Sequence, residues 1–303
     1  MGNFTCVIWK VEHGSAAFVR TPNDRTIIFD AGSSDNFSPA SFLTAQYNYN
    51  ATDKRIDKLI ISHPDRDHIS DLPNIRTLLY PKILSRNKDI PESAIYASGT
   101  NDLKEPLKTY HEMNKEYNSP VTGYNMTEPI SNWGDVLVKT FSCTPSHIGE
   151  IGQDKLKNNL SVISYVRYMD TEIIFPGDLE PIGWQALFEN TEFEKYVGKA
   201  KYRIRVASHH GRKSGIYYTV DGKEYCYDKI FEVIKPNLVI MSDKRGSETT
   251  VPESYRPRVD GGLYVISGES KKQELKKVIT TKTNNFVLID LQENIGIPSI
   301  AIP

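Results

Sequence analysis

Side chains of the kinds that bind metal ions gather just after four apolar, strand-like segments. His63, Asp65, Asp67 and His68 follow the first such segment, and the other three segments are followed by His147, by Asp178 and by His209-His210. Because a sheet fixes the positions of its strand ends, side chains there can converge on one point. Imidazole and carboxylate together suit Zn, Mn, Fe or Ni. The pattern therefore predicts a metal site.

For the segment 63–68 taken alone, the alternative is a polar turn with capping aspartates and chance histidines. The other three positions each lie just past an apolar strand. Their recurrence favours the metal site over that alternative.

The elements that would position these side chains are β-strands. Short apolar runs predict strands at 4–9, 16–20, 26–30, 56–62, 136–141, 160–166, 172–175, 202–207, 237–242 and 285–290. Helical spacing predicts helices over 102–117 and 181–189. No linker rich in Pro, Gly or Ser divides the chain. We therefore expect one α+β domain over 1–303, with irregular insertions near 80–135 and 243–275 and with helices covering its sheets.

Composition excludes several classes of protein. With 37 Lys+Arg against 38 Asp+Glu in 303 residues, the chain is not a polybasic protein that coats nucleic acid through bulk charge. Its 39% hydrophobic content excludes global disorder. No apolar run approaches the roughly 18 residues of a membrane span, so we expect no membrane association. The three isolated cysteines argue against a thiolate zinc site and favour the cytoplasm.

The motifs resemble those of the metallo-β-lactamase superfamily, whose hallmark is HxHxDH after a strand. Here Asp65 stands at the second His, which gives HxDxDH. This variant is similar to the soluble metallo-β-lactamase domain of the ComEC/Rec2 competence proteins. The resemblance covers nearly the whole chain and includes Val11-x-x-Gly14, Asn159-Leu160-Ser161-Val162, Gly177-Asp178, His209-His210-Gly211 and Thr280-Thr281-Lys282-Thr283.

The resemblance implies an αββα sandwich of two mixed sheets, with two divalent ions, Zn or Mn or else Mg, at one sheet edge. Carried over by position, one ion would be bound by His63, Asp65 and His147, the other by Asp67, His68 and His210, and Asp178 would bridge them. Pro145 is an alternative match for the position given to His147. His209 is an alternative to His210, which is preferred because Gly211 follows it. His209 would then either support a ligand without binding the ion or donate a proton.

Two basic residues directly follow the proposed ligand loop. Arg212 and Lys213 predict contact with a substrate phosphate, although a solvated loop is the alternative. We expect a phosphodiesterase or nuclease that acts on DNA or RNA with a metal-activated hydroxide oriented by Asp67. The rival functions are hydrolysis of a lactone, thioester or other ester on the same metals, and a non-catalytic module stabilised by metal. The sequence does not indicate an oligomeric state.

Overall fold

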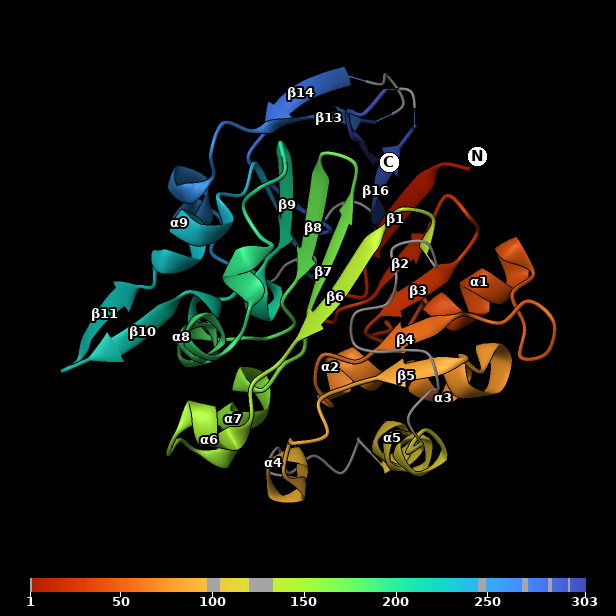
Figure 1. The fold of residues 1–303 in the computed structure, drawn as a ribbon, viewed down its shortest axis with the longest axis horizontal. Helices are drawn as coiled ribbons and strands as arrows, with labels where there is room; N and C mark the ends of the chain where they lie inside the picture. The colour runs from red at the N-terminus through yellow and green to blue at the C-terminus, as the bar shows by residue number, and fades with distance from the viewer. Residues whose placement is uncertain are drawn as a thin grey trace.

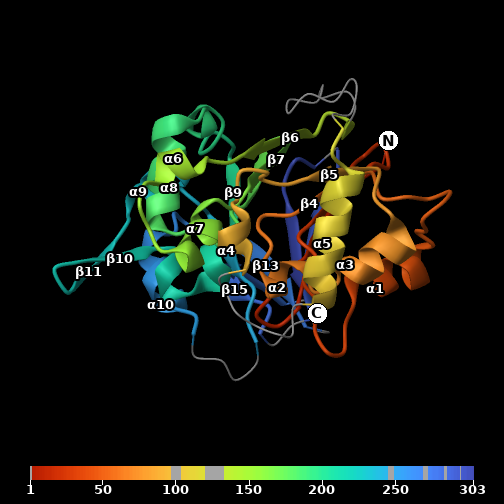
Figure 2. The same cartoon turned by 90° about the horizontal axis from the view of Figure 1, so that it is seen from below.

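A computed structural model describes residues 2–96, 104–119, 133–244, 249–268, 272–282, 285–293 and 295–303. Two mixed β-sheets pack face to face (Figure 1). The first sheet has the strand order β14 (Lys272–Lys276), β13 (Leu263–Ser267), β17 (Ser299–Ile302), β16 (Phe286–Leu291), β1 (Phe4–Trp9), β2 (Ala17–Arg20), β3 (Thr26–Phe29), β4 (Lys58–Ile60) and β5 (Ile83–Ser85). The second has the order β15 (Val278–Thr280), β12 (Leu238–Met241), β9 (Tyr202–Val206), β8 (Thr171–Phe175), β7 (Ile163–Tyr168) and β6 (Leu137–Phe141). A separate hairpin pairs β10 (Tyr217–Val220) with β11 (Lys223–Cys226) and projects from the body (Figure 2).

Helices cover the outer faces of the two sheets. The helices are α1 (Pro39–Tyr47), α2 (Arg66–Ile69), α3 (Leu72–Asn74), α4 (Glu92–Tyr96), α5 (Lys104–Glu116), α6 (Pro145–Ile148), α7 (Gln153–Asn159), α8 (Pro181–Asn190), α9 (Lys229–Ile234) and α10 (Pro252–Tyr255). Seen from below, α1, α3 and α5 lie on one side of the sheets, and α6 and α8 on the other (Figure 2). This arrangement confirms the predicted αββα sandwich of two mixed sheets.

The alternation of side chains along the strands divides the core into layers. In β1, Phe4, Cys6 and Ile8 point into the core between the sheets, whereas Trp9 packs into the core beneath the helices. Between the sheets, the rings of Phe29 and Phe175 stack with centroids 4.3 Å apart. Apolar burial on both faces explains why the central strands read as continuous apolar runs.

All ten predicted strands are present; the strand at 4–9 has the predicted bounds, and the other nine have shifted ends. The largest shift concerns the strand predicted at 160–166, because β7 begins only at Ile163. The backbone N–H of Val162 instead donates to the carbonyl of Ser62 at 2.8 Å, so this residue joins one sheet to the other. Both predicted helices are present as α5 and α8, and residues 102–103 of the first prediction lie outside the described residues.

The segments predicted as irregular insertions contain regular elements. The segment 80–135 includes β5, α4 and α5, and the segment 243–275 includes α10, β13 and most of β14. Residues 97–103, 120–132, 245–248 and 269–271 of these segments lie outside the described part of the chain. Among the helices that are described, none is long and apolar enough to cross a membrane.

Candidate metal centre

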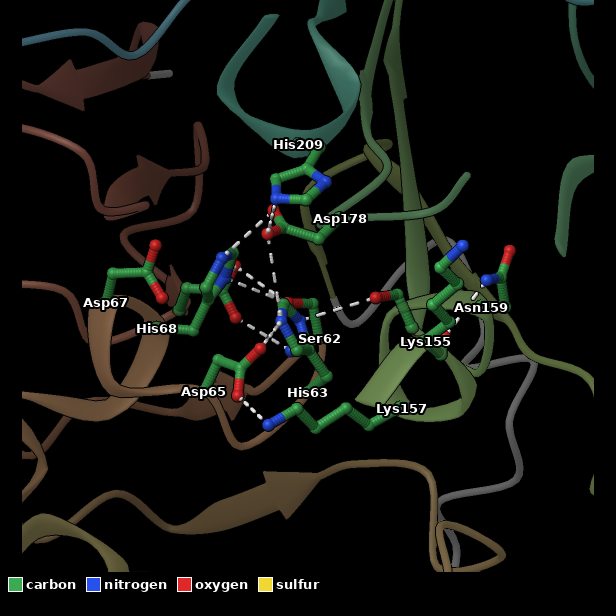
Figure 3. A network of polar contacts seen from close by, with 12 residues as sticks. Ser62, His63, Asp65, Asp67, His68, Lys155, Lys157, Asn159, Asp178 and His209 are labelled. Atoms are coloured by element: carbon green, nitrogen blue, oxygen red, sulfur yellow. Dashed lines mark hydrogen bonds and ion pairs between the residues drawn. The ribbon is translucent and has the colours of Figure 1, made fainter. Parts of the chain in front are cut away.

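The predicted ligands come from loops that follow strands in both sheets. Strand β4 runs parallel to β3, and β8 runs parallel to β9, so each pair of strands delivers its carboxyl ends to the same edge. The backbone N–H of His209 donates to the carbonyl of Gly177 at 3.1 Å and ties the last two loops together. Figure 3 shows the side chains of these loops facing one another.

Gly177 lets the Asp178 loop approach the loop after β4. Its φ is +58°, in the left-handed region that favours glycine. A Cβ on Gly177 would lie 2.6 Å from Cβ of Ser62, well inside contact distance. Only glycine therefore allows this spacing between Asp178 and the histidines of the other sheet.

Four side chains place ligand atoms around one point. Nε2 of His68 lies 3.0 Å from Oδ1 of Asp178 and 3.2 Å from Nε2 of His210. Nε2 of His210 lies 3.1 Å from Oδ2 of Asp67. All four ligand atoms lie within 4.8 Å of one another. Two imidazole nitrogens and two carboxylate oxygens at this spacing fit a divalent ion such as Zn²⁺ or Mn²⁺.

A buried polar group fixes the orientation of His68. Its Nδ1 donates to Oδ2 of Asp30 at 2.8 Å, and Asp30 also accepts hydrogen bonds from the backbone N–H and the hydroxyl of Ser62, at 2.7 and 3.0 Å. Because the carboxylate accepts the Nδ1 proton, Nε2 is left to face Asp178 and His210. Carboxylates that hold a histidine in this way raise its basicity as a metal ligand.

The charges at the four ligands are strongly coupled. Burial would lower the pKa of His210, but Asp178 and Asp67 outweigh it and raise the pKa to about 9. Burial likewise opposes the charged form of His68, but Asp178 and Asp30 hold its pKa well above the usual range. The histidines in turn hold the pKa of Asp178 well below its usual range, although burial would raise it. Positive charge is thus favoured at this point, as a metal site requires.

His63 and Asp65, which the sequence predicts as ligands of the first ion, do not belong to the group of four converging side chains. Oδ2 of Asp65 lies 3.3 Å from Nε2 of His63, and the other oxygen of Asp65 pairs with the ammonium of Lys157. Oδ2 of Asp178 lies 3.9 Å from Nε2 of His63. Burial would raise the pKa of Asp65, but His63 and Lys157 outweigh it, so the pKa is lowered.

His147 is not among the side chains that the structure brings together at this point. Its side chain is exposed, and its Nδ1 accepts a hydrogen bond from the backbone N–H of Thr144 at 3.3 Å, in the capping box of α6. Pro145, the alternative, is the first residue of the same helix. The capping role explains why a polar residue follows the strand here.

His209 and His210 occupy different surroundings. Only His210 belongs to the four-ligand group, whereas Nε2 of His209 lies 3.5 Å from Oδ2 of Asp178. Nδ1 of His209 lies 3.2 Å from Oε1 of Glu180 and 2.8 Å from Oγ of Ser214. Both histidines have left-handed backbone angles, which turn the two rings to different sides of the loop.

The two predicted phosphate-binding residues also differ. Nε of Arg212 is buried and has no hydrogen-bond partner among the described residues. Lys213 is exposed and forms an ion pair with Glu224 of the projecting hairpin. The charge of Arg212 acts on His13: burial and then Arg212 lower the pKa of His13, and His210 acts in the same direction.

Sequence reasoning missed several residues that contact the predicted site residues, among them Asp30, Ser62, Lys157 and Glu180. Asp30 is the last residue of the strand predicted at 26–30, and this polar strand end could have drawn attention to it. Lys157 offers no such signal, because lysine in a polar helical segment is normally exposed.

Comparisons with known proteins agree with this geometry. Residues 9–148 match the family model described as "Metallo-beta-lactamase superfamily", which does not distinguish a ComEC-like branch. No curated protein matches the chain.

Three solved structures are similar to the chain at low sequence identity. A mutant of the CmlA beta-hydroxylase is 15% identical, with a TM-score of 0.43, over 79% of this chain and 46% of that one. A protein described as a metal-dependent hydrolase from Parabacteroides distasonis is 11% identical, with a TM-score of 0.42, over 90% of this chain and 91% of that one. A long form RNase Z from yeast is 11% identical, with a TM-score of 0.40, over 99% of this chain and 50% of that one. The chain thus spans about half the length of the first and the third of these proteins.

The superfamily consists largely of hydrolytic metalloenzymes, and the candidate site suits that chemistry. Two of the four ligands, Asp67 and His68, lie within the matched residues, and Asp178 and His210 lie beyond them. Residues 9–148 are therefore similar to the metallo-beta-lactamase superfamily, and the loops that carry Asp178 and His210 lie past the matched segment.

Proposed function

We propose that the protein is a metal-dependent phosphodiesterase whose substrate class is nucleic acid, DNA or RNA. The converging ligand atoms of Asp67, His68, Asp178 and His210 support the metal dependence. The preference for phosphodiesters rests on Arg212, which follows the His210-Gly211 turn and keeps a buried Nε without a hydrogen-bond partner among the described residues. A guanidinium in such a place can bind a phosphate oxygen with charge-assisted hydrogen bonds. The HxDxDH variant, similar to that of the ComEC/Rec2 domain, agrees with this proposal.

A divalent ion held by Asp67, His68, Asp178 and His210 would lower the pKa of a water molecule to supply a nucleophile and would neutralise charge on the substrate oxygen. The protein's own residues then set the geometry. Asp67 is the least buried of the four ligands, so its carboxylate can orient the nucleophile toward an incoming substrate. Asp30 holds the His68 ring in place through Nδ1.

His209 is suited to donate a proton to the leaving oxygen. Its side chain is partly exposed, and Glu180 and Ser214 hold Nδ1 while Nε2 faces the site beside Asp178. A positioned imidazole of this kind is the commonest general acid in enzymes. His147 has no role in this mechanism, because its ring caps α6.

The proposal is tested with protein loaded with Zn²⁺ or Mn²⁺ and two chromogenic substrates, bis(p-nitrophenyl) phosphate and the uncharged ester p-nitrophenyl acetate. Arg212→Ala should lower phosphodiester hydrolysis about tenfold or more, because it removes a charge-assisted hydrogen bond to phosphate. Hydrolysis of the uncharged ester should change little. Lys213→Ala is the matched control, since Lys213 is engaged with Glu224.

The rival functions give different results. Good hydrolysis of lactones or thioesters with no turnover of any phosphodiester would establish another class of hydrolase on the same site. Full metal occupancy with no hydrolysis of any of these substrates would establish a non-catalytic module.

A further inference from the structure

A buried lysine lies directly against the candidate metal centre. Lys157, near the end of α7, is only 2% exposed, and its ammonium pairs with Oδ1 of Asp65 (Figure 3). Lysine is almost never fully buried unless its charge is compensated. The side chain is therefore committed to the site, in contrast to Lys155 on the same helix, which is exposed.

The ammonium pairs with a residue that the sequence predicts as a ligand of the first metal ion. That ion would be bound by His63, Asp65 and His147, and bridged by Asp178. His63 and Asp65 do face each other, with Nε2 3.3 Å from Oδ2, and Nε2 of His63 is buried without a hydrogen bond among the described residues. The third ligand, His147, is exposed and caps α6 instead. Lys157 thus supplies positive charge to Asp65, as the first ion would.

A permanent cation at Asp65 changes what this half of the site can bind. The ammonium occupies one oxygen of Asp65 and repels a divalent ion placed next to it. Only His63, the other Asp65 oxygen and one oxygen of Asp178 would remain to bind such an ion. The printed ion pair of Lys157 is with Asp65, which lies outside the four-ligand group of Asp67, His68, Asp178 and His210.

We infer that Lys157 takes the place of the first metal ion, so that the protein binds one divalent ion, at Asp67, His68, Asp178 and His210. This inference rests on the proposed function, because it assumes a metal at the four-ligand group. The sequence predicts a site with two ions. In the inferred site, one ion is bound and the ammonium of Lys157 stands in for the other. Lys157 is then a positioning residue that holds Asp65 and sets the metal content.

The test is the number of ions per chain, measured by elemental analysis after loading with Zn²⁺ and removal of unbound metal. Wild-type protein should bind one ion. Lys157→Met keeps the length and apolar stem of the side chain but removes the charge, and it should bind a second ion at His63 and Asp65. Lys157→Arg keeps a cation and should bind one ion, as should Lys155→Met, the matched control on the same helix. The variants are compared by circular dichroism to establish that they fold, and Lys157→Gln replaces Lys157→Met if the latter does not.

The outcomes separate this inference from the proposed function. Two ions in the wild-type protein, with hydrolysis intact, would overturn the role of Lys157 and leave the proposed function standing. A single ion in folded Lys157→Met would also overturn it. If the wild-type protein binds no ion, the proposed function itself fails.

Discussion

Oδ2 of Asp30 lies 2.8 Å from Nδ1 of His68, and both side chains are buried. This hydrogen bond connects the end of β3 to the ligand loop after β4, so the two residues act together although 38 positions separate them. The bond sets which nitrogen of His68 faces the metal site.

Asp30→Asn should weaken metal binding, although it removes none of the four candidate ligands. The amide cannot stabilise the His68 ring as a carboxylate does, so affinity for Zn²⁺ should fall about 10- to 100-fold. Competition titration with a metal-binding dye measures this change. Asp24→Asn, in the exposed pair with Arg20, is the control and should leave the affinity unchanged. Equal affinities for Asp30→Asn and wild type would show that the hydrogen bond from His68 to Asp30 does not strengthen Zn²⁺ binding.

The metal-free protein should become less stable as the pH rises. Burial lowers the pKa of His210, but Asp178 and Asp67 raise it to about 9, above its ordinary value of 6.5. A group with a raised pKa in the folded state contributes stability below its unfolded pKa and loses it as the pH passes the folded pKa. We expect a loss on the order of 3 kcal/mol between about pH 6 and 10.

Thermal unfolding of protein treated with a chelator measures this dependence. In His210→Ala the decline of the melting temperature with pH should be shallower, and His68, whose pKa is also raised, should account for the part that remains. Parallel profiles for His210→Ala and wild type would contradict the assignment to His210.

Gly177→Ala should destabilise the fold and disturb the site together. The new Cβ would lie 2.6 Å from Cβ of Ser62, at a backbone φ of +58°. Steric strain and the left-handed backbone should together cost about 2–5 kcal/mol of unfolding free energy. Gly149→Ala is a matched control, because Gly149 also has a positive φ but nothing within 4 Å of the added Cβ. Chemical denaturation compares the two, and equal losses would show that the contact with Ser62 is unimportant.

The central strands and most ligand positions could be predicted because buried strands are apolar runs that end abruptly in polar residues. The strand that leads into Ser62 and His63 is an example. The hairpin of β10 and β11 was missed because most of its side chains are exposed, so no apolar run marks it. Its turn, Asp221-Gly222, is a typical two-residue hairpin signal that could have revealed it.

The part of the site that could not be predicted depends on tertiary packing. Lys157 looks like an exposed helical residue in the sequence, and only the packing of α7 buries it beside Asp65. His147 has the residue type and strand-end position of a ligand, but the capping box of α6 determines where its ring lies. Residue type and spacing do not show where the ring of such a histidine lies.

Binding of single-stranded DNA should depend on salt mainly through Arg212. Each phosphate contact releases a counterion, so Arg212→Ala should flatten the log–log salt dependence of binding by about one unit. Lys213→Ala should change the slope less, because Lys213 pairs with Glu224, although such an exposed pair is weak. Fluorescence anisotropy over a series of salt concentrations, with Asp67→Ala added to prevent cleavage, gives the slopes. Identical slopes with and without Arg212→Ala, both in the Asp67→Ala protein, would show that Arg212 does not contact phosphate.

The most direct measurement is anomalous X-ray scattering at the zinc absorption edge, from crystals of the protein loaded with Zn²⁺. We expect an anomalous peak within bonding distance of Asp67, His68, Asp178 and His210, whose ligand atoms already lie within 4.8 Å of one another. Metal-loaded crystals with no peak at these four side chains, or with zinc bound only elsewhere, would contradict a metal-dependent hydrolase built on this site.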